Sequence, residues 1–164
     1  MIKLVAFDLD GTIADTIPMC IEAFKQAVTP YASKILSEDD IVKTFGLNEE
    51  GMIKQVVAED WEKALIDFYT IYKEMHTMYI QPFTEIRELI TELKENSLIV
   101  SLITGKGQKS CDITLRHFEM EALFDNISIG SHDRNTKAES MAKLMSKYNI
   151  QPSEMVYVLS LIHI

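Results

Sequence analysis

Residues 2–12 read IKLVAFDLDGT, an apolar run that changes abruptly into two aspartates, a glycine and a threonine. The run from Ile2 to Phe7 is interrupted by a single lysine and has the length of a strand buried inside a parallel sheet. Asp8 and Asp10 are one residue apart, so on an extended segment their side chains point to the same side. We therefore predict a buried first strand with two carboxylates at its carboxyl end.

The segment that follows, from Thr16 to about Tyr79, has helical spacing throughout and no strand-like alternation. Its first part repeats apolar residues on one helix face, namely Met19, Ala23, Phe24, Ala27 and Val28. Ser37 is expected to cap a second helix that stops at Phe45-Gly46. A longer helix is predicted over Trp61–Tyr79. This segment is best described as a helical cap.

Strands and helices alternate after Gln81-Pro82. The predicted helices cover residues 83–93, 108–117 and 138–148, and the predicted strands cover residues 98–103, 126–129 and 155–158. Such alternation favours an open parallel sheet covered by helices. The predicted fold class is α/β, a Rossmann-like sheet with an all-helical cap inserted after the first strand. We expect a core domain from residues 1–14 and 82–164, and a cap domain from residues 15–81.

Composition narrows the class of protein. The 164 residues suit one core with a small insertion, and 47% hydrophobic content is ample for packing it. A formal net charge of −9 should repel a polyanion, which argues against nucleic-acid binding. Two cysteines without metal-ligand spacing argue against disulfide or zinc scaffolding. Neither a signal peptide nor a membrane-spanning run is recognisable, so we expect a cytoplasmic protein without membrane association.

Asp8 and Asp10 suggest a metal site. Open α/β sheets place their ligands at the carboxyl ends of the strands. Two carboxylates held this close repel each other unless a cation or a shared proton lies between them. An oxygen-only pair suits Mg²⁺, which also binds substrate phosphate. We predict both as ligands of Mg²⁺; the alternative is that acids at a strand end merely cap a helix.

The run FDLDGT, residues 7–12, with Ala14-Asp15-Thr16 behind it, resembles the first motif of the haloacid dehalogenase superfamily. More narrowly it resembles phosphoglycolate phosphatase-like members with a helical cap. The resemblance implies that Asp8 attacks phosphorus and becomes an aspartyl phosphate. It also implies that Asp10 protonates the leaving group and then activates water. The substrate implied by the resemblance is a small phosphorylated metabolite, and the implied cofactor is Mg²⁺.

Two later segments are similar to further motifs of that superfamily. Thr104-Gly105-Lys106 resembles the second motif, which implies that the threonine hydroxyl and the glycine amide bind substrate phosphate. The alternatives are an ordinary turn, and for Lys106 a solvated loop lysine. Lys137 resembles the basic residue of the third motif, which implies that it offsets the charge of nucleophile and phosphate, although the family often has proline where this chain has Ala138.

The fourth motif departs from the family pattern. Where Gly-Asp is expected after the last strand, the chain reads Leu159-Ser160, and neither Ser160 nor His163 is a suitable Mg²⁺ ligand. Relative to the family this predicts a C-terminally truncated chain of low or no activity, with an exposed apolar strand at the edge of its sheet. Residues 159–164 are either native or a sequencing artefact.

Three functions remain open on the sequence. The leading one is a Mg²⁺-dependent phosphatase, and the second is a sugar phosphomutase of the same superfamily. The third is a catalytically dead fragment, or a module that merely holds phosphate. Phosphoglycolate, pyrophosphate, nucleotides and sugar phosphates all fit as substrates, and the oligomeric state is unknown. The scattered histidines are not expected to be catalytic, and Cys20 and Cys111 are expected to be small buried hydrophobic residues.

Overall fold

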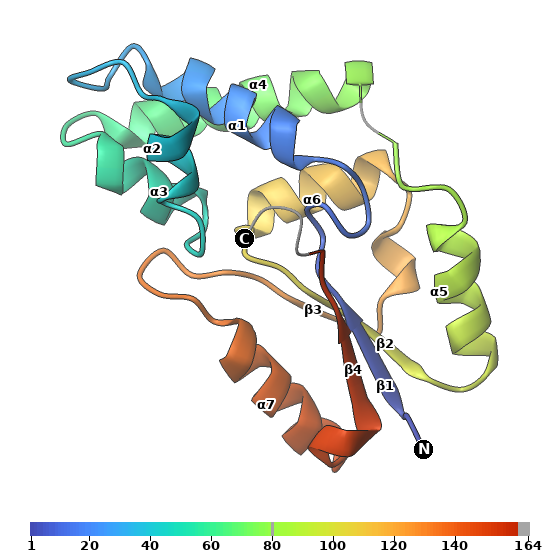
Figure 1. The fold of residues 1–164 in the computed structure, drawn as a ribbon. Helices are drawn as coiled ribbons and strands as arrows, with labels where there is room; N and C mark the ends of the chain where they lie inside the picture. Colours follow the sequence, from blue (N-terminus) through green and yellow to red (C-terminus); the bar gives the residue numbers. More distant parts are fainter. Residues whose placement is uncertain (80, 161–164) are drawn as a thin grey trace.

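A computed structural model describes residues 1–79 and 81–160 of the chain, and Figure 1 shows its course. The elements in order are β1 (Leu4–Phe7), α1 (Ile17–Val28), α2 (Glu38–Val42), α3 (Glu49–Val56), α4 (Trp61–Tyr79), α5 (Ile86–Glu95), β2 (Ile99–Ile103), α6 (Gln108–His117), β3 (Asn126–Ser128), α7 (Lys137–Tyr148) and β4 (Met155–Val158). Short 3-10 turns precede β3 and β4, at Glu121–Leu123 and Pro152–Glu154.

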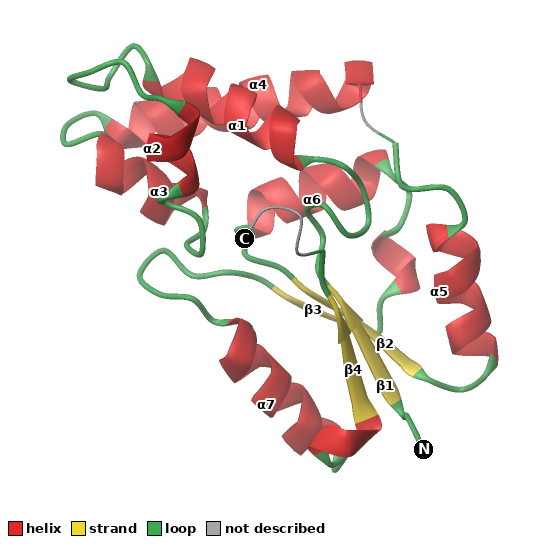
Figure 2. Cartoon of the chain, in the orientation of Figure 1, coloured by secondary structure: helices red, strands yellow, loops and turns green. Residues whose placement is uncertain are grey.

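The strands form one parallel sheet in the order β3-β2-β1-β4. Strand β1 lies between β2 and β4, with Val5 opposite Val100 on one side and Val156 on the other. Figure 2 shows the helices on both sides of this sheet, which confirms the predicted α/β fold with a helical insertion after the first strand. In this order β1 and β4 are neighbours, so the loops that follow them leave the same edge of the sheet.

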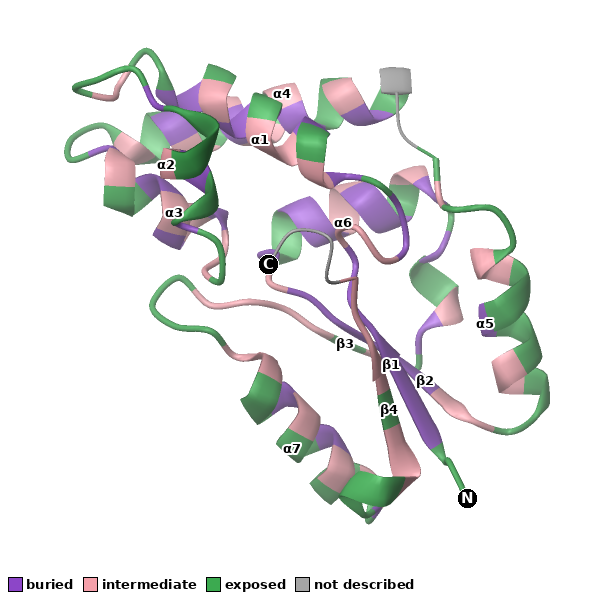
Figure 3. Ribbon diagram, viewed as in Figure 1, coloured by how far each residue is buried: buried purple, intermediate pink, exposed green. Residues whose placement is uncertain are grey.

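The two faces of β1 explain its continuous apolar sequence. Leu4 and Ala6 belong to a hydrophobic cluster with Leu144 of α7 on one face. Val5 and Phe7 belong to a second cluster on the opposite face, which includes residues of α5 and α6. All four residues of the strand are buried, as Figure 3 shows. A strand covered by helices on both sides has no solvent face and therefore no polar alternation.

Helices α1 to α4 gather beyond the carboxyl edge of the sheet, where they pack on one another (Figure 1). Their shared cluster includes Phe24, Ile53 and Phe68. The five apolar residues predicted on the inner face of α1 are all buried, so that prediction is confirmed. None of the helices within the described ranges is long and apolar enough to cross a membrane.

The second cap helix is shorter than predicted. Ser37 caps it as expected, because its hydroxyl accepts from the Asp40 N–H and the Asp40 carboxylate accepts from the Ser37 N–H. The helix ends at Val42, however, and not at Phe45-Gly46. Tighter hydrogen bonds take over there, and the N–H of Phe45 donates to the Val42 carbonyl three residues back.

A separate helix, α3, then begins after Asn48, whose side chain accepts from the Gly51 N–H. The helical spacing of the sequence does not separate this helix from the rest of the helical segment. The predicted helix over residues 83–93 also begins later, at Ile86.

A buried polar chain joins cap helix α4 to α6. The Tyr72 and Thr114 hydroxyls are 2.8 Å apart, and His76 Nε2 lies 3.0 Å from the Thr114 hydroxyl. His76 Nδ1 lies 3.1 Å from the Tyr72 carbonyl oxygen. Because a carbonyl can only accept, Nδ1 carries the proton and Nε2 is an acceptor, which shares the single Thr114 hydroxyl proton with the Ser110 carbonyl 3.1 Å away. Burial lowers the pKa of His76 to about 4.

This depressed pKa predicts a pH-dependent stability. Between pH 6.5 and about 4 the unfolded chain protonates His76 while the folded protein does not, so the free energy of unfolding falls as the pH falls. Between pH 7 and pH 5 the expected loss is on the order of 2 kcal/mol. Urea unfolding at pH 7 and pH 5 tests this. His76→Gln should lose less stability than the parent on acidification, whereas His132→Gln, at an exposed position, should behave like the parent. Equal losses in the parent and His76→Gln would contradict the prediction.

Candidate active site

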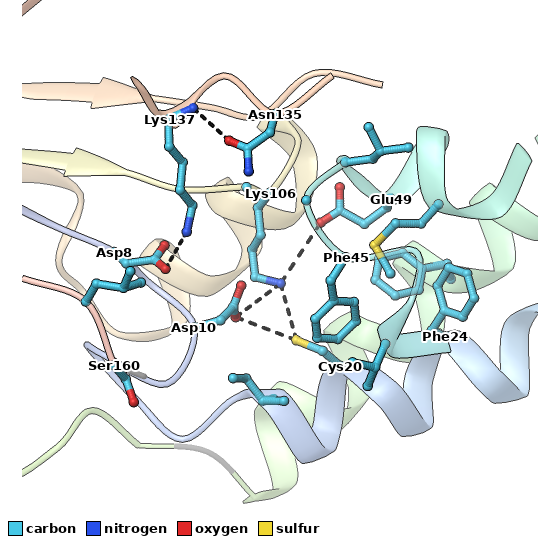
Figure 4. A pocket seen from close by; sticks show the side chains of 18 residues that line it. Asp8, Asp10, Cys20, Phe24, Phe45, Glu49, Lys106, Asn135, Lys137 and Ser160 are labelled. Atoms are coloured by element: carbon cyan, nitrogen blue, oxygen red, sulfur yellow. Dashed lines mark hydrogen bonds and ion pairs between the residues drawn. The ribbon is translucent and has the colours of Figure 1, made fainter. Parts of the chain in front are cut away.

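A pocket of about 500 Å³ lies where the carboxyl ends of the strands meet the helical cap (Figure 4). The loop after β1 contributes Asp8 and Asp10, and the loop after β2 contributes Gly105 and Lys106. Lys137 enters it from the start of α7. The structure thus brings five of the six residues predicted from the sequence to one cavity. The sixth, Thr104, is not among its lining residues.

Asp8 is the more deeply placed of the two acids. Its Oδ1 accepts from the Leu9 N–H at 2.9 Å, and its Oδ2 is 2.6 Å from Lys137 Nζ. Burial raises the pKa of the Asp8 carboxyl, and the charge of Asp10 adds to this, whereas Lys137 opposes it. The carboxylate is therefore poorly solvated and is held in place by one cation and one amide.

Asp10 points from the same loop toward the cap (Figure 4). Its Oδ1 accepts from the Thr16 hydroxyl at 2.5 Å and from the Cys20 thiol at 3.6 Å. Lys106 Nζ lies 3.3 Å from the same oxygen. The turn that makes room for this arrangement includes Gly11, whose φ of +73° is strained for residues with a side chain. Side chains from the start of α1 and from the loop after β2 therefore fix one orientation of Asp10.

Lys106 is buried, so the solvated loop lysine left open by the sequence is excluded. Its ammonium group lies between Asp10 and Glu49, 3.3 and 4.0 Å away, and 4.5 Å from the centre of the Tyr72 ring. Although burial lowers the pKa of Lys106, the neighbouring Asp10 carboxylate contributes to raising it well above its ordinary value. The amine stays charged because its partners are fixed around it.

Glu49 was not predicted as a site residue. It is the first residue of α3 and is buried, and its carboxylate accepts from the Gly107 N–H at 2.9 Å and from the Ser110 hydroxyl at 2.5 Å. These donors belong to the first turn of α6, where the helix dipole favours an anion. An acid in a first turn is usually a helix-start residue, so the sequence carried no signal that it crosses from cap to core.

Cys20 was expected to be a small buried hydrophobic residue, and this was wrong. It is partly exposed and lines the pocket, where its sulfur accepts from Lys106 Nζ at 3.3 Å. Burial of the thiol, reinforced by the charge of Asp10, raises the pKa of Cys20 to about 12. The neutral thiol is therefore a donor to Asp10. Cys111, by contrast, is buried in the core as expected.

The remaining predicted phosphate-binding residues differ in position. Gly105 lines the pocket. Thr104 is buried outside the pocket lining, and its hydroxyl oxygen accepts from the Lys106 N–H at 3.2 Å. A direct role of Thr104 toward phosphate stays a prediction.

The end of β4 contributes Leu159 and Ser160 to the pocket. The Ser160 N–H donates to the Thr12 hydroxyl at 3.0 Å, which ties this segment to the loop after β1. His163 lies outside the described residues. The position after β4 therefore carries a serine where the family pattern predicts a carboxylate.

The two acids fit a magnesium ion only as part of its ligand set. Over residues 1–79 and 81–160, no group of three or more histidine, cysteine, aspartate or glutamate side chains is placed to hold a metal. Mg²⁺ is commonly bound by one or two carboxylates together with water and substrate phosphate. Asp8 and Asp10 lie close enough that the charge of one raises the pKa of the other. A divalent cation beside them would relieve that repulsion.

Comparisons with known proteins point in the same direction. A family model described as haloacid dehalogenase-like hydrolase matches residues 5–158. A protein from Caldanaerobacter subterraneus subsp. tengcongensis that bears the name pyrophosphatase PpaX is 26% identical over 132 residues. The match covers 80% of this chain and 60% of that protein.

Two solved structures share the fold. One is a predicted phosphoglycolate phosphatase from Haemophilus somnus, with a TM-score of 0.76 at 20% identity. The other is CbbY from Rhodobacter sphaeroides in complex with phosphate, with a TM-score of 0.78 at 16% identity. The matches cover 95% and 96% of this chain, and 76% and 77% of those chains.

Proposed function

Because the chain belongs to the haloacid dehalogenase-like hydrolases, we propose that it is a Mg²⁺-dependent phosphatase that hydrolyses a small phosphorylated metabolite through an aspartyl phosphate on Asp8. The observation that carries the proposal is the buried Asp8 carboxylate, held by Lys137 at 2.6 Å in a pocket that also contains Asp10. Phosphate bound to CbbY, a structural neighbour, is consistent with this chemistry.

The reaction divides into two displacements at phosphorus. In the first, an Asp8 oxygen forms a bond to phosphorus, the ester P–O bond breaks, and the leaving oxygen takes a proton from Asp10. In the second, Asp10 removes a proton from water, whose oxygen attacks phosphorus and releases inorganic phosphate and the free Asp8 carboxylate. Lys137 keeps Asp8 in place and offsets charge on the phosphoryl oxygens. Mg²⁺, when bound, supplies further positive charge to those oxygens.

The cap supports a small substrate. Glu49 and Cys20 of the cap contact Lys106 and the start of α6, so cap and core line the pocket together. Closure of a cap over a bound substrate excludes bulk water and strengthens electrostatic interactions within the site. The net charge of −9 also disfavours an extended polyanion. We propose a single phosphomonoester of low molecular mass as the substrate.

Serine at the end of β4 predicts weak metal binding and low turnover. Ser160→Asp places a carboxylate at the pocket position where the family pattern has its last acid. We expect Mg²⁺-dependent release of 4-nitrophenol from 4-nitrophenyl phosphate, at a rate at least about tenfold higher in this variant than in the parent chain. A chelator should remove the activity of both proteins.

The same assay separates the alternatives. Absence of Mg²⁺-dependent hydrolysis in both proteins would overturn the proposal in favour of a module that merely holds phosphate. Transfer of the phosphoryl group to an added hexose phosphate, in place of water, would instead identify a phosphomutase.

A further inference from the structure

The cap side of the pocket is apolar. It is formed by Phe24, Val42, Phe45, Leu47, Met52 and Phe68. Two of these, Val42 and Phe45, are large hydrophobic residues that remain 39% and 38% exposed. Figure 4 shows Phe24 and Phe45 on the side of Cys20 away from Asp8. The pocket therefore offers water-exposed apolar surface to the part of a ligand that lies beyond the phosphoryl group.

The cations of the pocket are already neutralised. Among its described lining residues, the positively charged side chains are Lys106 and Lys137. Lys137 pairs with Asp8, and Lys106 lies between Asp10 and Glu49. Three carboxylates thus face two ammonium groups. Mg²⁺ beside Asp8 and Asp10 would be occupied by those acids and the phosphoryl group, so a second anionic group on the ligand would find no unpaired cation among the described lining residues, which costs free energy.

The Glu49 carboxylate is fixed in its position beside Lys106. Its carboxylate is held by the Gly107 N–H and the Ser110 hydroxyl, so Lys106 keeps its cap partner. Asn135, another lining residue, is neutral, and its side-chain oxygen accepts from the Lys137 N–H. The recognition chemistry beyond the phosphoryl group is therefore dominated by apolar contact.

We infer that the leaving group of the substrate is apolar, of the size of a branched alkyl chain or a single ring, and carries no carboxylate or second phosphate. The inference rests on the proposed function, since it takes the phosphoryl group to lie at Asp8. It separates this chain from the substrates that its relatives' names suggest, because pyrophosphate and phosphoglycolate both have an anionic leaving group. A volume of about 500 Å³ accommodates such a molecule.

Two isosteric phosphonates test the inference without requiring turnover. In 3-methylbutylphosphonate an isopropyl group replaces the carboxylate of 3-phosphonopropanoate, so the two compounds match in chain length and branching and differ chiefly in charge. Calorimetric titration with Mg²⁺ present gives both affinities, with inorganic phosphate as the reference ligand. We expect the alkyl compound to bind at least about tenfold more tightly, because its methyl groups are buried against the cap.

A lysine in the cap wall should reverse the preference. Phe45→Lys, with Val42→Lys as a second and independent variant, should weaken binding of the alkyl compound and strengthen that of 3-phosphonopropanoate. Ile35→Lys is the matched control, since Ile35 is a cap residue that is 87% exposed and does not line the pocket. It should leave both affinities unchanged.

The outcomes separate the two proposals. Binding of phosphate together with equal or tighter binding of 3-phosphonopropanoate would overturn the inference and leave the phosphatase proposal intact. Failure of phosphate and both phosphonates to bind would overturn both.

Discussion

Replacing Asp8 with asparagine is expected to reduce phosphate release by at least about 10⁴-fold, the scale on which covalent enzymes lose activity with their nucleophile. An amide oxygen neither attacks phosphorus effectively nor pairs with Lys137, which lies 2.6 Å from the carboxylate. The substitution is made in the Ser160→Asp protein, whose higher activity allows a loss of this size to be measured. The rate of 4-nitrophenol release is the measurement.

Asp39→Asn is the control for the Asp8 experiment, because Asp39 is exposed on α2. It should hydrolyse 4-nitrophenyl phosphate at the rate of its parent. Undiminished hydrolysis by Asp8→Asn would remove Asp8 from the role of nucleophile. The pocket would then need another group to accept the phosphoryl group.

Replacing Lys106 with methionine is expected to cost about 3–5 kcal/mol of unfolding free energy, the range for breaking a buried ion pair. The substitution leaves Asp10 and Glu49 facing each other without the cation between them. Urea unfolding at pH 7 measures the change. The same substitution should also lower activity, since Asp10 loses a group that orients it.

The control and the compensating variant make the Lys106 experiment specific. Lys143→Met removes an exposed lysine paired with Glu139, and should change stability by less than about 0.5 kcal/mol. Adding Glu49→Gln to Lys106→Met removes one stranded charge and should recover part of the loss. A Lys106→Met protein as stable as Lys143→Met would mean that the buried charge cluster contributes nothing to the cap–core contact.

The spacing of apolar residues along the sequence predicted most of the helices and strands. The long helix over Trp61–Tyr79 and the strand over Met155–Val158 have the bounds expected from the sequence. Both are long or uniform enough that one apolar pattern decides the structure. The end of α2 could not be predicted, because it depends on turn hydrogen bonds after Val42 that any of several residue types can make.

Residues of the site could be predicted from the sequence only where they belong to a recognisable motif. Asp8 and Lys137 are 129 positions apart in the chain and resemble residues of two different motifs. In the structure they form an ion pair. Glu49 and Cys20 belong to the same pocket but resemble ordinary residues of amphipathic cap helices. Their role depends on how the cap packs over the carboxyl edge of the sheet, which is set by tertiary contacts that local sequence does not encode.

The phosphoryl-transfer account is tested most directly by trapping the phosphorylated protein. A labelled phosphate ester is mixed with excess protein and Mg²⁺, quenched in acid within the first turnover, and digested for peptide mass analysis. The account predicts phosphate on the peptide that contains Asp8, removable by hydroxylamine as an acyl phosphate and absent from Asp8→Asn. Release of inorganic phosphate without any protein-bound label at early times would contradict it.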